Sequence, residues 1–190
     1  LALGPGLGRN GETGEVVRRI LLNTTTTCVI DADALNVLQG HTQVLETMKA
    51  PKILTPHPGE MARLIELSTA EVDEARVEIA RAYAEKWQAV IVLKGVPTVV
   101  AHPDGQVFLN PTGNPSMATG GSGDSLTGLI AGLLAQKMGP LEASLAGVYL
   151  HGLAGDLAAK ERVGLAAGDL ALAFPRARYL VENGLVKNVL

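Results

Sequence analysis

Residues 114–128 read NPSMATGGSGDSLTG, and this stretch decides what fold we expect. Three glycines, Gly120, Gly121 and Gly123, stand directly before the acidic residue Asp124, and an apolar run of helical character follows. Glycine loops at helix starts favour phosphate, because backbone amides and the positive end of the helix attract anions. No Gly-Lys-Ser/Thr follows the glycines, so the loop is not a Walker A motif.

Asp124 admits two interpretations at this position. As a helix cap, its side chain would accept hydrogen bonds from amides of the first turn. As a general base, it would take the proton of an attacking hydroxyl while the neighbouring amides hold a phosphate. The second interpretation explains a carboxylate beside a phosphate loop, because the carboxylate then faces the hydroxyl that accepts the phosphoryl group.

The sequence before this loop alternates short apolar runs with helical stretches. Expected strands cover residues 1–3, 28–31, 53–55 and 90–94, and expected helices lie near residues 12–23, 33–38, 58–66 and 71–87. The last helix is the clearest, because apolar residues recur on one face and Ser68 or Thr69 can cap it. Such alternation is typical of a parallel sheet covered by helices on both faces.

The pattern changes after residue 94. Two further strands, residues 98–102 and 106–109, flank a tight turn at residues 103–105 and predict an antiparallel hairpin. From Gly123 onward the sequence is helical, and Gly128 and Gly132, one turn apart, predict close contact with a neighbouring helix. We therefore expect one α/β domain spanning residues 1–190, with a largely parallel central sheet plus an antiparallel hairpin.

Composition limits the classes of partner. The 190 residues suffice for a sizeable core, and 47% are apolar, but no window reaches the length of a membrane span. Mixed charges with a net value of −3 and only 3% aromatic residues argue against nucleic acid and anionic membranes as partners. The single cysteine, Cys28, is expected in the core and suits a reducing compartment, so we expect a cytoplasmic enzyme acting on a small molecule.

A second glycine loop competes as a ligand site. GLGRNG, residues 6–11, matches the dinucleotide-binding pattern G-x-G-x-x-G, and Asp31 ends the next expected strand. Alone, this pattern would indicate a Rossmann oxidoreductase. The same residues also fit a simple glycine turn that joins a strand to a helix. Both interpretations stay open on the pattern itself.

Longer stretches resemble one branch of the ribokinase-like superfamily, the ADP/ATP-dependent NAD(P)H-hydrate dehydratases. GGSGD resembles the superfamily signature G-x-G-D at a helix start. The family's other motifs occur in order: GPGLG (residues 4–8), VIDADALN (29–36), ILTPHPGEMARL (53–64), VLKGVPTVV (92–100), GNPSMATGGSGDSLTGLIAGLLAQ (113–136) and YLHGLAGDLAA (149–159). Together they extend over most of the chain.

The resemblance implies a repair enzyme, a lyase that removes water from hydrated NADH or NADPH. In this family a nucleotide, ADP or ATP with Mg²⁺, phosphorylates the ring hydroxyl, and phosphate leaves as the double bond re-forms. For individual residues, it implies that Asp124 is the base at the substrate hydroxyl and that Gly6 and His57 contact the hydrated dinucleotide. It implies nucleotide binding by Gly123 and by a segment after the fourth strand: Lys94, Gly95, Val96, Pro97 and Thr98.

His57 lies between Pro56 and Pro58, just beyond an expected strand end, where open α/β sheets bind ligands. Its spacing to Glu60 suggests a metal pair, but Pro58 and Gly59 disfavour presentation on a helix, and no second ligand cluster is present. We expect no protein-held metal, and Mg²⁺ is expected to arrive with the nucleotide phosphates.

Asp31, Asp33 and Lys94 keep two interpretations, and His151 has one. Asp31 and Asp33 either hydrogen-bond substrate or a magnesium-bound water, or Asp33 only caps the following helix. Lys94 binds the nucleotide if the family resemblance holds; judged from its position alone, it is a surface lysine at a strand end. His151 lies on an apolar helix, and we expect it to be a core residue.

Family members carry strands and helices before the GPGLG loop, so we expect an N-terminally incomplete domain. The resemblance also implies a homo-oligomer, a tetramer in many members, and a fused or separate NAD(P)H-hydrate epimerase. The main alternative is a ribokinase-like kinase of a thiazole or pyrimidine vitamin precursor, with the same Asp124 chemistry but a phosphorylated product. A degenerate, non-enzymatic partner of an active homologue is a further alternative.

Overall fold

The computed structural model describes residues 1–160 and 164–188 and contains a six-stranded sheet in the order β1-β2-β3-β4-β5-β6. The strands are β1 (Ala2–Leu3), β2 (Cys28–Ile30), β3 (Lys52–Leu54), β4 (Val90–Leu93), β5 (Val99–Ala101) and β6 (Val107–Leu109). β1 to β4 pair in parallel, whereas β4-β5 and β5-β6 pair antiparallel. The expected largely parallel sheet with an antiparallel hairpin is confirmed.

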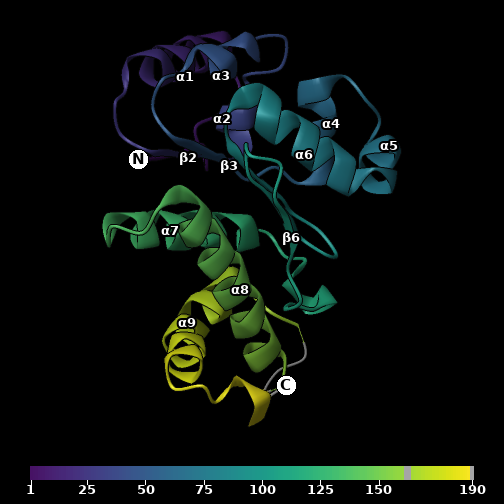
Figure 1. The fold of residues 1–190 in the computed structure, drawn as a ribbon, viewed down its shortest axis with the longest axis vertical. Coiled ribbons are helices and arrows are strands. Elements are labelled where there is room, and N and C mark those ends of the chain that lie inside the picture. Colours follow the sequence, from purple (N-terminus) through teal and green to yellow (C-terminus); the bar gives the residue numbers. More distant parts are fainter. Residues whose placement is uncertain (161–163, 189–190) are drawn as a thin grey trace.

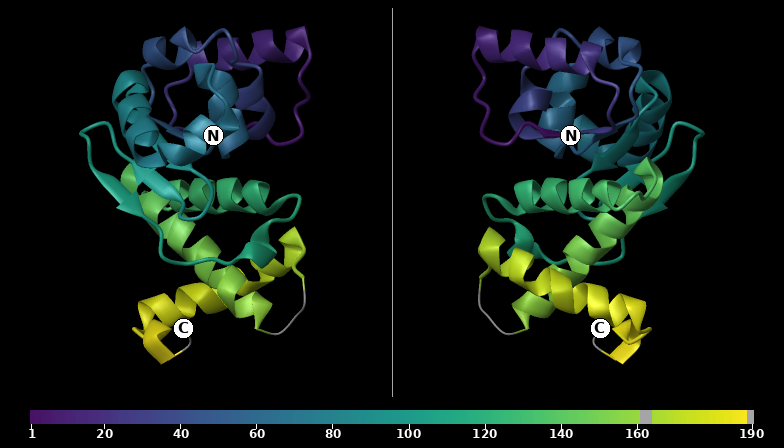
Figure 2. Two further views of the ribbon diagram at one scale, coloured as in Figure 1. Left: turned by 90° about the vertical axis from the view of Figure 1, so that its right-hand side faces the viewer. Right: turned by 90° about the vertical axis from the view of Figure 1, so that its left-hand side faces the viewer.

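Helices cover both faces of this sheet (Figures 1 and 2). One face carries α1 (Gly11–Asn23), α2 (Ala32–Asn36), α3 (Gln43–Thr47), α4 (Pro58–Ile65), α5 (Thr69–Glu74) and α6 (Arg76–Trp87). The other face carries α7 (Ser122–Ala135) and α8 (Pro140–Ala159), and α9 (Ala167–Glu182) packs on α8. Short 3₁₀ turns lie at η1 (Pro115–Met117) and η2 (Val186–Asn188).

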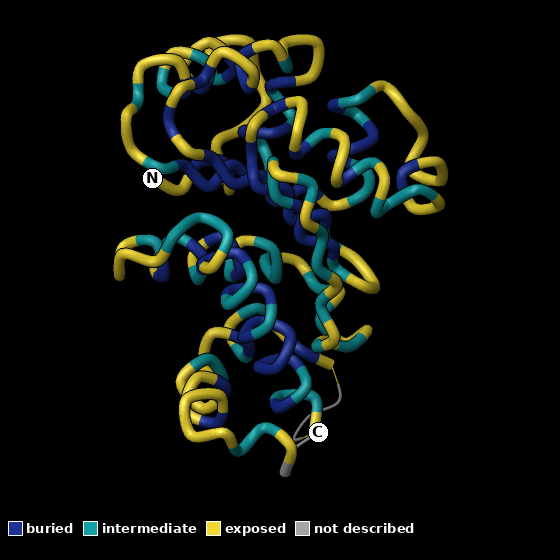
Figure 3. Tube along the Cα trace, viewed as in Figure 1, coloured by how far each residue is buried: buried dark blue, intermediate teal, exposed yellow. Residues whose placement is uncertain are grey.

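The alternation of side chains along each strand divides the core into two layers. In β2, Cys28 and Ile30 pack among the helices α1 to α6, whereas Val29 between them packs against α7 and α8. The strands are therefore buried on both faces, as Figure 3 shows, and read as continuous apolar runs in the sequence. Cys28 lies in the core, as expected.

The expected helix over residues 71–87 is in fact two helices. The chain leaves helical geometry at Ala75 (φ −114°, ψ 37°), between α5 and α6. The break lets Val72 of α5 enter the core while Arg76, the first residue of α6, reaches the end of β4. Ser68 does cap α5, because its hydroxyl accepts a hydrogen bond from the Glu71 amide.

The expected close packing at Gly128 and Gly132 is wrong. Both glycines are exposed, and a Cβ added at either would meet nothing within 4 Å. The close contacts come instead from glycines of α8. Gly147 packs against Ile130 of α7, and a side chain at Gly152 would overlap Thr112. In the part of the chain that the structure describes, no helix is long and apolar enough to cross a membrane.

Candidate active site

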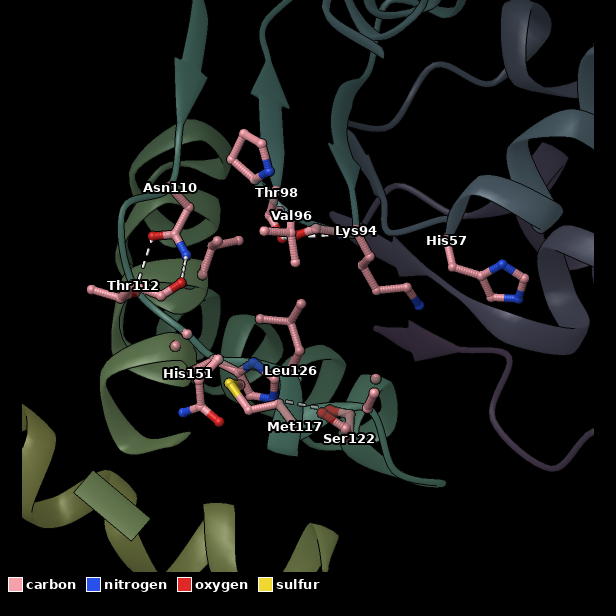
Figure 4. A pocket seen from close by; sticks show the side chains of 18 of the residues that line it. His57, Lys94, Val96, Thr98, Asn110, Thr112, Met117, Ser122, Leu126 and His151 are labelled. Atoms are coloured by element: carbon pink, nitrogen blue, oxygen red, sulfur yellow. Dashed lines mark hydrogen bonds between the residues drawn. The ribbon is translucent and has the colours of Figure 1, made fainter. Parts of the chain in front are cut away.

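A cavity of about 720 Å³ opens where the carboxyl ends of β2, β3 and β4 face the start of α7. Its size is in the range that small-molecule sites occupy. One wall comes from the loops after these strands, and the opposite wall comes from residues 110–119, the first turn of α7 and the middle of α8. Figure 4 shows the side chains of both walls.

The first turn of α7 presents open hydrogen-bond donors to this cavity. Gly121 is the N-cap residue, with a φ of +83° that favours glycine. The amides of Gly123 and Asp124 have no acceptor among the residues that the structure describes. Unpaired first-turn amides and the positive helix end form an anion-binding site. Both residues line the cavity, as their expected role in binding requires.

Asp124 does not cap α7. It is the third residue of the helix, its side chain is exposed, and it forms no hydrogen bond or ion pair with the described residues. The capping interpretation of the sequence is therefore wrong. Its carboxylate is open to the cavity, where it is available to accept a proton from a bound hydroxyl.

Lys94 supplies the cavity's positive charge. Its ammonium donates to Asp31 Oδ1 at 2.8 Å and lies 3.8 Å from Glu60 Oε2. It also lies close to the start of α7, because a Cβ added at Gly123 would be 3.1 Å from Lys94 Nζ. The side chain is 20% exposed, so Lys94 is not the free surface lysine that its place at a strand end allows. An ammonium beside open helix amides is matched to a phosphate.

Asp31 orients both Lys94 and α7. Its side chain is 1% exposed, and its second oxygen accepts a hydrogen bond from the Thr127 hydroxyl at 2.7 Å. Burial alone would raise the pKa of the Asp31 carboxyl, but the Lys94 ammonium and these hydrogen bonds lower it below its ordinary value. Its oxygens bind protein groups, which argues against a direct bond to substrate.

Asp33 has a different function from the two that the sequence suggested. Its carboxylate accepts the Gly8 amide at 3.0 Å and the Arg9 side chain at 2.7 Å. It therefore neither caps α2, in which it lies, nor lines the cavity. Instead it fixes the loop after β1. That loop contains Gly6, which has a φ of +72°, is exposed, and lies outside the cavity lining.

His57 is the N-cap of α4 and lines the cavity. Its Nδ1 accepts the amides of Gly59 (3.0 Å) and Glu60 (3.2 Å), and its own amide donates to Glu60 Oε2 at 2.8 Å. The neutral ring therefore carries its proton on Nε2, which is 3.5 Å from Glu60 Oε1. Burial, together with the nearby cations Lys94 and Arg63, lowers the pKa of His57 below its ordinary value, despite the opposing Glu60 carboxylate.

Residues 94–98 form the part of the cavity wall between β4 and β5. Thr98 closes this loop, because its hydroxyl donates to the Gly95 carbonyl at 3.0 Å and accepts the Gly95 amide at 3.3 Å. Val96 at the tip is exposed, although it is a large apolar residue. An exposed apolar residue and a charged lysine in one cavity wall suit a ligand that has both an apolar and an anionic part.

Residues 110–119 form a wall of the cavity that the sequence did not predict, although residues 113–119 belong to the glycine-loop motif. The Asp156 carboxylate of α8 accepts the Gly113 amide and the Asn114 side chain, each at 2.9 Å, and the Thr112 hydroxyl donates to the Tyr149 carbonyl at 2.9 Å. Several members of this wall line the cavity, among them Asn110, Thr112, Asn114 and Met117. The available signal was the family motif that begins at residue 113, since the segment has no periodic pattern.

His151 was expected to be a core residue, and it is buried, but it also lines the cavity. Its Nε2 lies 3.0 Å from the Ser122 carbonyl and 3.1 Å from the Ser125 hydroxyl, so it holds the first turn of α7 (Figure 4). Burial lowers the pKa of His151 to about 4, and the ring is neutral at pH 7. No group of three or more His, Cys, Asp or Glu side chains within the described residues could hold a metal ion.

A family model described as NAD(P)H-hydrate dehydratase matches residues 1–176. The chain belongs to this family. The family assignment agrees with the resemblance in the sequence motifs. The names of the curated relatives described next support the dehydratase interpretation rather than the vitamin-precursor kinase.

Two curated relatives of the NAD(P)H-hydrate dehydratase family illustrate the similarity. The bifunctional NAD(P)H-hydrate repair enzyme Nnr of Moorella thermoacetica is 52% identical over 185 residues, which cover 96% of this chain and 34% of the relative. The ADP-dependent (S)-NAD(P)H-hydrate dehydratase of Bacillus subtilis is 41% identical over 180 residues, which cover 93% of this chain and 62% of the relative.

A solved structure shares the fold. The Bacillus subtilis ADP/ATP-dependent NAD(P)H-hydrate dehydratase, co-crystallised with ATP/Mg²⁺, matches with a TM-score of 0.83 and 38% identity over 94% of this chain and 63% of that protein. A ribokinase-like superfamily protein of Enterococcus faecalis also matches, with a TM-score of 0.78 and 33% identity over 92% of this chain and 61% of that protein, which confirms the ribokinase-like fold expected from the sequence. The chain spans between about a third and just under two thirds of the length of these relatives.

Proposed function

We propose that the chain is the nucleotide-dependent dehydratase part of an enzyme that restores hydrated NADH or NADPH. The observation that carries the proposal is the first turn of α7. There, the exposed Asp124 carboxylate lies in the same cavity as the Lys94 ammonium and as two amides that have no acceptor among the described residues. A base, an anion site and a cation within one cavity are what phosphoryl transfer to a hydroxyl requires. The names of the relatives supply the substrate class.

The proposed chemistry has two steps. Asp124 takes the proton of the ring hydroxyl while the oxygen of that hydroxyl attacks the terminal phosphorus of the nucleotide. The bond from that phosphorus to the bridging oxygen breaks. The ring carbon–oxygen bond then breaks with loss of phosphate, while a proton leaves the adjacent ring carbon and the double bond forms. Phosphate is a far better leaving group than hydroxide, which explains why a lyase reaction consumes a nucleotide.

The residues around the cavity divide between two ligands. We assign the nucleotide, ADP or ATP, to residues 94–98 and to Gly123, where an ammonium and open amides are available for phosphate oxygens. Mg²⁺ would be carried by those oxygens and hold most of its ligands as water. We assign the hydrated dinucleotide to His57 and Asp124 in the cavity, and to Gly6, which lies outside the cavity lining on the loop after β1. His57 would donate from Nε2 to an oxygen of the substrate.

The wider setting of the enzyme follows from the resemblance. We propose a cytoplasmic enzyme that forms a homo-oligomer. A NAD(P)H-hydrate epimerase, fused or separate, would supply the substrate form that the dehydratase accepts. The bifunctional name of the Moorella thermoacetica relative supports a second activity on one chain.

Mixing the chain with hydrated NADH, Mg²⁺ and either ADP or ATP tests the proposal. We expect recovery of reduced-nicotinamide absorbance that depends on the nucleotide. Asp124→Asn should bind nucleotide normally but lose at least ~10²-fold in turnover, the usual size of a general-base contribution. Lys94→Ala should weaken nucleotide binding instead, which separates the two roles.

Three results would contradict the proposal in different ways. A phosphorylated heterocycle without absorbance recovery would favour the vitamin-precursor kinase. Normal turnover of Asp124→Asn would remove Asp124 from the chemistry. A folded chain that binds neither ADP nor ATP would overturn the assignment of residues 94–98.

A further inference from the structure

Arg76 contacts the back of the cavity wall. It is the first residue of α6, and its Nη2 donates to the Lys94 carbonyl at 2.7 Å, with the Leu93 carbonyl at 3.5 Å. Its Nη1 donates to Asp73 Oδ1 at 2.8 Å. The Arg76 side chain is only 14% exposed. A largely shielded guanidinium thus binds the backbone at the point where β4 becomes the loop of residues 94–98.

Gly95 shows how close this contact is. Its φ is +144°, and a Cβ built there would overlap the guanidinium of Arg76. The loop backbone therefore lies directly on the guanidinium, and only glycine leaves room for it. Such an approach fixes where the chain turns at Gly95, and hence the direction in which the next residues leave β4.

Lys94 is consequently held from two sides. Arg76 binds its carbonyl behind the loop, and Asp31 binds its ammonium inside the cavity at 2.8 Å. Its amide donates to the Pro56 carbonyl at 2.8 Å. The Arg76 side chain itself does not line the cavity, so it can influence a ligand only through the loop.

We propose that Arg76 is a positioning residue for the nucleotide, which it serves by fixing residues 94–98 in their binding conformation. This inference rests on the proposed function, because that function places the nucleotide on these residues. Without the guanidinium, the Lys94 carbonyl loses its donor, and the loop must be ordered when the nucleotide binds. Ordering on binding reduces affinity.

Arg76→Met and Arg76→Lys test this role, with Arg81→Met as the matched control. Arg81 lies on the same helix but is exposed. We expect Arg76→Met to raise the Kd for Mg²⁺-ADP or Mg²⁺-ATP about 10-fold, which corresponds to ~1.4 kcal/mol. Arg76→Lys should lose less, because an ammonium can still reach the Lys94 carbonyl but lacks the planar fork. Arg81→Met should bind as the unaltered chain does.

Two further measurements separate positioning from general destabilisation. Hydrogen exchange of the Gly95, Val96 and Thr98 amides, without nucleotide, should be faster in Arg76→Met than in Arg81→Met. The Kd for hydrated NADH should stay within about 2-fold, because a loss confined to one loop leaves the other ligand's residues in place. If Arg76→Met does not fold, Arg76→Lys carries the same comparisons.

The outcomes distinguish this inference from the proposed function. Unchanged nucleotide affinity in Arg76→Met, in a chain that otherwise binds nucleotide, overturns the inference alone. Equal weakening of both ligands, or unchanged exchange of the loop amides, also overturns it, because Arg76 would then be merely structural. Failure of the unaltered chain to bind nucleotide overturns the proposed function and this inference together.

Discussion

Asp31→Asn should destabilise the fold by an amount that depends on pH. The substitution removes a buried negative charge and leaves its shape nearly unchanged. Among the described residues, Lys94 then keeps one carboxylate partner, Glu60 at 3.8 Å, and a neutral amide oxygen replaces the carboxylate oxygen at 2.8 Å. The Thr127 hydroxyl can rotate to accept from the new amide, so that hydrogen bond is largely retained.

The magnitude follows from the burial of the pair. Removing one partner of a fully buried ion pair costs about 3–5 kcal/mol. Water reaches Lys94, which is 20% exposed, and Glu60 compensates part of the lost attraction, so we expect ~2–3 kcal/mol at pH 7. For a chain of this size, that loss lowers the Tm by roughly 5–10 °C.

The pH dependence identifies the cause. The pKa of Asp31 is lowered in the folded state, so its contribution is present above the ordinary value of 3.8 and is lost as the pH falls through the folded value. The difference between the unaltered chain and Asp31→Asn should therefore shrink on acidification. Urea unfolding at a series of pH values measures it, with fluorescence of the buried Trp87 as the signal.

Asp33→Asn is the matched control. It makes the same chemical change two residues further on, where the carboxylate pairs with the exposed Arg9. Its cost should stay below ~1 kcal/mol. A loss below ~0.5 kcal/mol for Asp31→Asn at pH 7, or an equal loss at pH 7 and near pH 3, would refute the ion-pair explanation.

Two other buried groups give predictions. Lys52→Met should raise the free energy of unfolding by ~1 kcal/mol or more, because a buried ammonium with few partners is costly. Lys52 is 4% exposed, and among the described residues its side chain donates a hydrogen bond only to the Met48 carbonyl. Burial also lowers the pKa of Lys52. A destabilised variant in urea unfolding would contradict this. The pKa of His151 falls to about 4 in the folded chain, so between about pH 6.5 and 4 the unfolded chain binds a proton at His151 that the folded chain does not. The free energy of unfolding should therefore fall by on the order of 2 kcal/mol by about pH 4.5. His151→Gln should flatten that decrease in the same assay, and an unchanged slope would show that other groups cause it.

The strands and most helices could be predicted because their signals are local. Continuous apolar runs such as residues 90–93 can hardly be anything but buried strands. The α5–α6 break could not be predicted, since the apolar spacing continues through Ala75 and the cause is tertiary. The predicted close packing at Gly128 and Gly132 was wrong for the same reason, because the spacing of glycines does not show whether a neighbouring helix lies there.

The site was predictable only in part. Motif resemblance indicated His57, Asp124 and residues 94–98, and the structure brings them together around one cavity. The pairing of Asp31 with Lys94, 63 residues apart, and with Thr127, 96 residues apart, depends on the sheet order and on α7 crossing it. No local pattern encodes such contacts.

The capping role of His57 has a consequence for the design of inhibitors. Because two helix amides occupy Nδ1, the ring cannot flip without uncapping α4, and it offers a ligand only the hydrogen on Nε2. A compound that places a carbonyl, phosphoryl or ring-nitrogen lone pair there would gain a hydrogen bond. One that places a protonated amine there would meet donor against donor. Screening libraries for this protein should therefore be weighted towards acceptors at that point.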